Sequence, residues 1–325
     1  MKFVPPALIP LLLHIPLIAY TQALDISRFF RTGLNIRAEY IPNADLQDTT
    51  GSVSFTRYNA QLIMPLKGRI KASWRELDIT AKQYFLTLNG GVRQIRNSKN
   101  TPFEPYHNLY TASFAVAGLR AGLRSKMWLY AFGGGITESI STFNNLHPYA
   151  TVAALRVKIK GLNHQKFYGL AAVYSNSTIP FIIAPIWGIN KKIFSKTTLT
   201  LILPVQAQLT YKFDRKNNLA LLLTPGGYNG GVQDTNLTKN KIRLQYIYSH
   251  FKSAACWNWK PNSNVRLTLE AGLLWGRNIV LSYLPDRSKK DAIETRLKPS
   301  PVFSLNVYAS LTNKFLDSSD FAFEF

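Results

Sequence analysis

The chain has 325 residues, and its 39 Lys plus Arg residues against 17 Asp plus Glu residues give a formal net charge of +22. Hydrophobic residues make up 46% of it and aromatic residues 13%, which excludes a disordered polycation, because such chains are poor in both. The mean hydropathy of −0.06 also excludes a membrane protein built from several apolar helices. The length fits one large domain or two ordinary ones.

The first 23 residues have the pattern of a secretory signal peptide. Lys2 precedes an apolar run over residues 3–20, and small residues lie next to the expected cleavage site after Ala23. Four prolines within the run disfavour a stable membrane-spanning helix. We therefore expect export of a mature chain, residues 24–325, that forms a single domain and has no nucleic acid as a partner.

Beyond residue 23, apolar residues recur with a period of two. Leu34, Ile36, Ala38 and Tyr40 alternate with polar or charged residues, and only a strand places two such sets on opposite faces. The same alternation recurs in residues 149–160, 242–248, 265–273 and 303–311. Clusters of Gly, Pro, Asn and Asp separate these segments, as expected of turns. The class is therefore all-β.

A soluble sandwich and a transmembrane barrel are both built from such strands. The apolar face points inward in the sandwich and outward to lipid in the barrel. Three features favour the barrel: aromatic residues near the ends of the strand-like runs, glycine-rich strand pieces, and a C-terminal Phe-Ala-Phe-Glu-Phe that ends at Phe325. Such an end resembles the signal that the barrel-assembly machinery reads. The prediction is a closed antiparallel up-and-down transmembrane β-barrel of about twelve strands, within a range of about ten to fourteen.

Three short segments carry a family resemblance. The run Tyr40-Ile41-Pro42, the strand from Tyr58 to Leu66, and Leu201-Ile202-Leu203-Pro204 followed by residues 209–213 are similar to an uncharacterised family of outer-membrane β-barrel proteins from Bacteroidota-type bacteria. The resemblance covers essentially the whole mature chain. It implies a fold and a location in the cell outer membrane, and it brings no catalytic or ligand-binding residue.

Enzymatic activity is not indicated by the sequence. Some outer-membrane barrels use a Ser and His pair on lipids, but Ser249 and His250 are neighbours on a strand and point to opposite faces. Ser141 and His147 lie in a loop, where His147 is interpreted as an exposed histidine. No nucleophile-elbow, zinc-protease, phosphate-loop or dinucleotide motif occurs. We expect no catalytic residue, no cofactor and no metal site, and we interpret Cys256 as a small buried or lipid-facing residue.

The basic residues fall into polar strand faces and loop clusters. A lumen lined by cations favours anionic solutes, and six are candidates for that position: Arg37, Arg57, Arg156, Lys158, Arg243 and Arg266. Carboxylates are sparse, and Glu39 beside Arg37 and Glu270 near Arg266 are expected to form interior ion pairs that fasten the barrel. The loop cations either pair with phosphates of lipopolysaccharide or of the periplasmic leaflet, or only keep the loops solvated.

The leading hypothesis is an outer-membrane barrel with a structural or passive-transport role, porin-like and weakly anion-preferring if it is open. Its partners would be outer-membrane lipid, lipopolysaccharide and the barrel-assembly machinery. Two alternatives stay open: a lipid-modifying enzyme of the barrel type, and a soluble exported β-sandwich that binds acidic polysaccharide. The sequence does not distinguish an open lumen from a plugged one.

Overall fold

The computed structural model describes residues 32–47, 50–73, 78–98, 101, 104–122, 126–159, 164–175, 181–234, 243–283 and 293–310. The predicted signal peptide and Phe325 lie outside these residues. The strands are β1 (Gly33–Asp45), β2 (Ser52–Ser73), β3 (Asp78–Asn97), β4 (Tyr106–Gly122), β5 (Lys126–Glu138), β6 (Tyr149–Ile159), β7 (His164–Ser175), β8 (Phe181–Lys192), β9 (Thr197–Leu203), β10 (Gln206–Lys212), β11 (Asn217–Gln233), β12 (Arg243–Trp259), β13 (Val265–Tyr283), β14 (Ile293–Leu297) and β15 (Ser300–Ser310), with a 3-10 turn η2 (Ile140–Thr142) after β5. Among these residues, no helix is long and apolar enough to cross a membrane.

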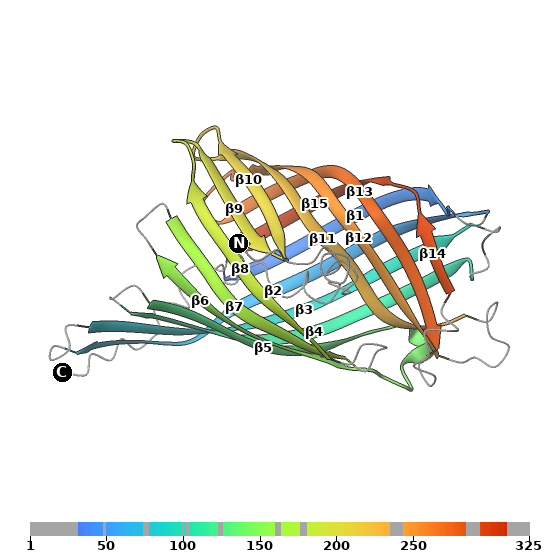
Figure 1. Ribbon diagram of the computed structural model, residues 1–325, viewed down its shortest axis with the longest axis horizontal. Helices are drawn as coiled ribbons and strands as arrows, with labels where there is room; N and C mark the ends of the chain where they lie inside the picture. The colour runs from blue at the N-terminus through green and yellow to red at the C-terminus, as the bar shows by residue number, and fades with distance from the viewer. Residues whose placement is uncertain are drawn as a thin grey trace, which may run out of the picture.

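The strands form one closed ring. Each strand from β1 to β13 pairs antiparallel with the next, and β15 closes the ring between β13 and β1, so that the red β15 lies beside the blue β1 (Figure 1). β14 and β15 pair with successive parts of β13 and share one position in the wall, which makes the barrel fourteen-stranded. The predicted closed antiparallel barrel is confirmed, and its fourteen strands lie at the upper end of the expected range of ten to fourteen.

Two local features explain the low strand count expected from the sequence. β9 and β10 have seven residues each, between the twelve of β8 and the seventeen of β11, and they are joined by only Pro204 and Val205. A proline lacks a backbone N–H and disfavours a central strand, yet β8 runs through Pro185. Pro185 lies opposite Leu170 of β7, and β8 pairs with β9 only from Trp187 onward, so the missing N–H of Pro185 is not needed on that side.

The two ends of the barrel differ. Gly33 at the start of β1 lies opposite Ser310 at the end of β15, so both ends of the barrel chain lie at one end of the ring. Connections at this end, here called the turn end, are short, such as residues 193–196, 213–216 and 260–264. Connections at the opposite loop end include the longer segments 139–148, 234–242 and 284–292. Short turns at one end and long loops at the other are typical of transmembrane barrels.

The outer face carries an apolar band. Residues that are direct partners in neighbouring strands point to the same side, and one such row is Leu62, Leu88 and Phe114. Leu88 is 42% exposed and Phe114 48% exposed, although both are large apolar side chains. The exposed side of the wall is therefore apolar over many strands, as a lipid-facing surface requires.

The interior is packed mainly with apolar side chains. One buried cluster includes Phe55 of β2, Leu109 of β4 and Tyr246 of β12, which belong to opposite sides of the ring. A second lies on β5 to β9 and in the β9–β10 turn and includes Leu155 and Phe167. In these parts of the barrel, apolar side chains face the interior. A barrel of this size has room for side chains to fill much of its interior.

Candidate functional site

A network of four charged side chains lies inside the barrel. Arg37 Nη2 of β1 donates to Glu39 Oε2 at 2.7 Å and to Glu270 Oε1 of β13 at 3.2 Å. Lys252 Nζ of β12 donates to the same Glu270 oxygen at 2.6 Å and lies 3.9 Å from Glu39 Oε2. The four side chains are between 7% and 15% exposed. Two cations and two anions balance, so the network fastens three strands and leaves no net charge for a ligand.

The register of the strands explains why these side chains lie close together. Glu39 of β1 lies opposite Ser304 of β15, which lies opposite Glu270 of β13, which lies opposite Cys256 of β12, so all four point to the same side of the wall. Arg37 Nη2 also donates to Ser304 Oγ at 3.3 Å, and the buried Cys256 thiol donates to Glu270 Oε2 at 3.8 Å. Cys256 thus faces the interior and contacts a carboxylate. Lys252 is a member that the sequence analysis missed.

Aromatic rings and two arginines fill the interior nearer the loop end. The Phe55 ring stacks on Tyr248 with centroids 4.7 Å apart, and Tyr228 stacks on Tyr246 at 5.6 Å. The Arg93 guanidinium of β3 lies 3.6 Å from the centroid of the Tyr228 ring of β11, which belongs to the opposite side of the ring. Buried Arg277 donates to Tyr248 Oη at 2.8 Å. The barrel is therefore bridged through its interior at this level.

A second bridge, here called the clasp, closes part of the loop end. Glu138 at the end of β5 is fully buried, and its carboxylate accepts hydrogen bonds from Arg243 Nη2 of β12 at 2.5 Å and Arg243 Nε at 3.3 Å. The Ser139 backbone N–H donates to the Gly231 carbonyl of β11 at 2.8 Å. A Cβ on Gly231 would contact Glu138 Oε2, so only glycine permits this close approach. β5 and β11 are separated by five strands around the ring, and the clasp draws them together.

The turn end has a polar cavity with lysines around it. Its volume is about 270 Å³, and its lining residues are Gln165, Asn190, Lys192, Ser195, Lys196, Thr198 and Lys212. Gln165 and Asn190 are direct partners and have the same strand parity as the buried Phe167 and Ile186, which places this cavity on the inner side of β7 to β10. The arrangement is suited to an anion, because lysines, amides and hydroxyls all donate hydrogen bonds.

Asp214 is the acidic residue nearest in sequence to the cavity residues, and its carboxylate is hydrogen-bonded within the β10–β11 turn. Its carboxylate accepts hydrogen bonds from the Asn217 side-chain amide at 3.0 Å and from the backbone N–H groups of Lys216 and Asn217 at 2.6 and 2.7 Å. These bonds hold the pKa of Asp214 below its usual range. Asp214 therefore stays ionised within the β10–β11 turn, where it stabilises the turn.

Of the six cations predicted for the lumen, four lie at strand positions that face the interior and two at positions that face outward. Arg37 and Arg243 are buried in the ion network and in the clasp, Arg57 lies opposite Glu39 in the sheet, and Arg266 lies on the same face of β13 as Glu270. The predicted pairing of Arg266 with Glu270 is replaced by the pairing of Glu270 with Arg37 and Lys252.

Arg156 and Lys158 are not lumen-facing, which corrects the sequence-based expectation. Both are exposed, on the face of β6 that also presents Val152, whereas Leu155 and Val157 are buried inside. They lie near the turn end, where the outer surface leaves the apolar band and cations become favourable. Lys192, Lys196 and Lys212, which the sequence places in or next to loop clusters, line the inner cavity instead.

His107, His147 and His250 contact groups other than a serine hydroxyl. His107 is buried and its Nε2 lies 3.3 Å from Asp234 Oδ2, while His147 Nδ1 lies 3.0 Å from the Asn145 carbonyl. His250 packs its ring on Tyr248, and Ser249 follows the opposite strand parity. In the part of the chain that the structure describes, no group of three or more His, Cys, Asp or Glu side chains is placed to hold a metal ion.

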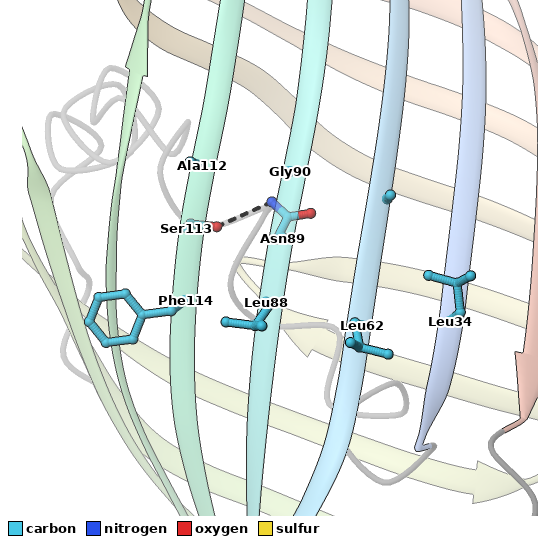
Figure 2. Close-up of a pocket in the computed structure, with 9 residues that line it drawn as sticks. Leu34, Leu62, Leu88, Asn89, Gly90, Ala112, Ser113 and Phe114 are labelled. Atoms are coloured by element: carbon cyan, nitrogen blue, oxygen red, sulfur yellow. Dashed lines mark hydrogen bonds between the residues drawn. The ribbon is translucent and has the colours of Figure 1, made fainter.

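A larger hollow of about 530 Å³ lies on the outer face (Figure 2). It forms where the small residues Ala60, Gly90 and Ala112 follow one another across β2, β3 and β4, next to the row that contains Leu88 and Phe114. A Cβ on Gly90 would meet no atom within 4 Å. The hollow is thus a gap in the apolar band, and its polar lining residues, Asn89 and Ser113, hydrogen-bond to each other at 3.2 Å.

Solved structures similar to this chain include outer-membrane channels and receptors. The COG4313 outer membrane channel from Pseudomonas putida F1 has a TM-score of 0.39 and 11% identity, covering 86% of this chain and 96% of that chain. The siderophore receptor PirA from Pseudomonas aeruginosa has a TM-score of 0.28 and 8% identity, covering 86% and 80%. The toluene transporter TodX from P. putida has a TM-score of 0.23 and 8% identity, covering 86% and 88%.

A search of curated proteins finds no match to the chain. A family model described as a domain of unknown function, DUF6268, matches residues 19–315, which include every strand of the barrel. The chain therefore belongs to the DUF6268 family.

Proposed function

We propose that the protein is an outer-membrane barrel with a passive-transport role and a weak preference for anions. The closed ring and the apolar outer band support a membrane location, because a barrel leaves no strand edge unpaired in lipid. Short connections at the turn end support an orientation with that end in the periplasm and the longer loops outside. Export by the predicted signal peptide, residues 1–23, is part of the same proposal.

The lysine-lined cavity at the turn end carries the anion preference. Lys192, Lys196 and Lys212 surround it, and no acidic residue occurs in the sequence between Glu138 and Asp214. A positive potential at a narrow opening raises the local concentration of anions and lowers that of cations. The charges of the ion network and of the clasp are paired within the barrel, so they contribute less to this potential.

The location is tested by fractionation and by gel migration. The protein is expected to separate with the outer membrane, and an unheated sample is expected to migrate differently from a boiled one, because the closed barrel persists in detergent until heating. A soluble β-sandwich would appear in the periplasmic or secreted fraction and would overturn the location.

Selectivity is tested by planar-bilayer recording of the refolded protein in a KCl gradient. The wild type is expected to show a small conductance with a reversal potential that favours chloride. Lys192→Gln, Lys196→Gln and Lys212→Gln together are expected to lower the chloride-to-potassium permeability ratio severalfold, since three positive charges leave the cavity. The matched control is the triple variant Arg120→Gln, Arg156→Gln and Lys158→Gln, which removes three positive charges from the outer face and should leave the ratio unchanged.

Each outcome of the recording decides one part of the proposal. An unchanged reversal potential in the cavity variant would remove the lysines as the source of selectivity. A complete lack of conductance in every salt would remove the transport role. A structural role is the second candidate function, and the observation that favours it is the bridged interior at the loop end, where Arg93 reaches Tyr228 and Glu138 reaches Arg243.

A further inference from the structure

A row of three cations and three aromatic rings crosses the outer face near the turn end. Six direct pairing partners on consecutive strands β3 to β8 form this row, here called the belt: Lys82, Arg120, Trp128, Arg156, Tyr168 and Trp187. Lys82, Arg120 and Arg156 are exposed, as are Tyr168 and Trp187 at 41% and 45%. Because direct partners point to the same side, all six side chains lie on one surface.

The belt lies at the border of the apolar band. Two residues further toward the loop end, the corresponding row includes Tyr84 and Tyr130, each 46% exposed. The row after that includes Phe132 and Val152, exposed by 56% and 53%, and it contains no charge. Two residues toward the turn end from the belt, Lys158 is exposed. The surface therefore changes from apolar to aromatic to cationic over a few residues, as the lipid interface requires.

Aromatic contacts orient the cations of the belt. The Arg156 guanidinium lies 5.8 Å from the centroid of the Trp128 ring, and that ring is parallel to the Tyr130 ring at 6.1 Å. An arginine held over a tryptophan keeps its N–H groups free to donate away from the ring. Such donors match the oxygens of a phosphate group.

Positive charge far exceeds acidic charge in this region. Between residues 79 and 192 the sequence contains only two acidic residues, Glu104 and Glu138, and both lie at the loop end. Cations that only keep a surface solvated need no aromatic neighbours, whereas here each arginine of the belt is the direct partner of Trp128. An anionic partner at the border of the apolar band would therefore match the charge of this surface.

We propose that the belt binds the phosphate groups of anionic phospholipids in the leaflet at the turn end. This inference rests on the proposed outer-membrane location, and in the proposed orientation that leaflet is the periplasmic one. Phospholipid, and not lipopolysaccharide, is then the source of the phosphate. The belt gives part of the +22 charge a partner outside the lumen and fixes the depth of strands β3 to β8 in the bilayer.

The test uses the full refolded chain in nanodiscs made of phosphatidylethanolamine with a minor fraction of phosphatidylglycerol. Lipids that remain bound after release are counted by native mass spectrometry. The wild type is expected to retain phosphatidylglycerol in preference to phosphatidylethanolamine. The amount of phosphatidylglycerol retained should fall as the salt concentration rises. The belt variant Lys82→Gln, Arg120→Gln and Arg156→Gln is expected to retain about tenfold less, because each removed cation near a lipid surface weakens the attraction.

Three controls separate the belt from a general charge effect. The loop-end triple Arg96→Gln, Arg296→Gln and Lys298→Gln removes the same charge from the opposite end and should keep the wild-type preference. Arg120→Lys with Arg156→Lys keeps the charge and should retain most of the bound phosphatidylglycerol. Gel migration of unheated samples verifies that each variant is folded.

Equal retention of phosphatidylglycerol by the belt variant and the wild type would overturn the proposal, as would a wild type with no preference for it. A further arm replaces phosphatidylglycerol with lipopolysaccharide. Loss of bound lipopolysaccharide in the belt variant, with phosphatidylglycerol unaffected, would overturn the choice of leaflet. Lipid retention is independent of conductance, so a barrel that is sealed in the recordings can still pass or fail this test.

Discussion

Replacing Glu270 with alanine is expected to lower the free energy of unfolding by about 3–5 kcal/mol, as for other buried ion pairs that lose one partner. Glu270 accepts hydrogen bonds from both Arg37 and Lys252, and all three side chains are at least four-fifths buried. After the substitution, two cations inside the barrel share the single carboxylate of Glu39. Their mutual repulsion and their lost hydrogen bonds both act against the folded state.

The loss is measured by urea unfolding in lipid vesicles, followed by tryptophan fluorescence. Glu294→Ala is the matched control, because Glu294 is an exposed strand carboxylate whose described contact is one hydrogen bond from Asn278 at 2.8 Å. Its effect is expected to stay within about 0.5 kcal/mol. Adding Lys252→Met to Glu270→Ala should recover part of the stability, since one unpaired cation is then removed. Equal losses for Glu270→Ala and Glu294→Ala would show that the network does not fasten the wall.

The fold class follows from local sequence because alternation is a property of each strand by itself. Leu34 to Tyr40 alternates in the sequence and forms the first half of β1, and the segment 303–311 corresponds to β15 in the same way. The number of strands depends on strand length and on pairing between strands, which a local pattern does not show. The short strands β9 and β10 carry too few residues for a clear pattern, and Pro185 is acceptable only because β9 ends before reaching it.

The direction in which an alternating face points is not encoded by its period. Leu155 and Val157 alternate with Arg156 and Lys158, and a lipid-facing or a lumen-facing apolar set gives the same pattern. Register across the neighbouring strands decides between them, because Arg156 is the partner of Trp128 and Tyr168 on the outer surface. The orientation of these cations therefore depends on residues of other strands, β5 and β7, and not on β6 alone.

The interior contacts show the same dependence on distant residues. Glu39 and Glu270 were expected to form interior ion pairs on the basis of nearby arginines, and the structure pairs both of them inside the barrel. Lys252 escaped notice because it lies just beyond the alternating segment 242–248. Glu138 and Arg243 are 105 residues apart, and no local pattern relates them. The Gly230-Gly231 pair in β11 was the available signal, since adjacent glycines in a strand mark a close approach of another backbone.

Breaking the clasp is expected both to destabilise the barrel and to open its loop end. Glu138→Ala removes the partner of Arg243 and also the acceptor of the Thr142 hydroxyl at 2.7 Å and the His147 backbone N–H at 3.1 Å. A buried arginine without its carboxylate is expected to cost about 3–5 kcal/mol, measured by the same unfolding experiment. Conductance in planar bilayers is expected to rise severalfold, because the ends of β11 and β12 are no longer held against β5.

A second substitution reaches the same contact from the other side and distinguishes opening from general damage. Gly231→Ala places a Cβ against Glu138 and within 2.5 Å of Arg243 Nη2, so the clasp must separate although every charge is retained. Gly90→Ala is its matched control, a strand glycine with free space around the added carbon, and it should leave both stability and conductance near the wild type. If Gly231→Ala raises conductance and Gly90→Ala does not, the clasp is the barrier at the loop end. If both variants conduct like the wild type, the barrier lies deeper, where Arg93 crosses to Tyr228.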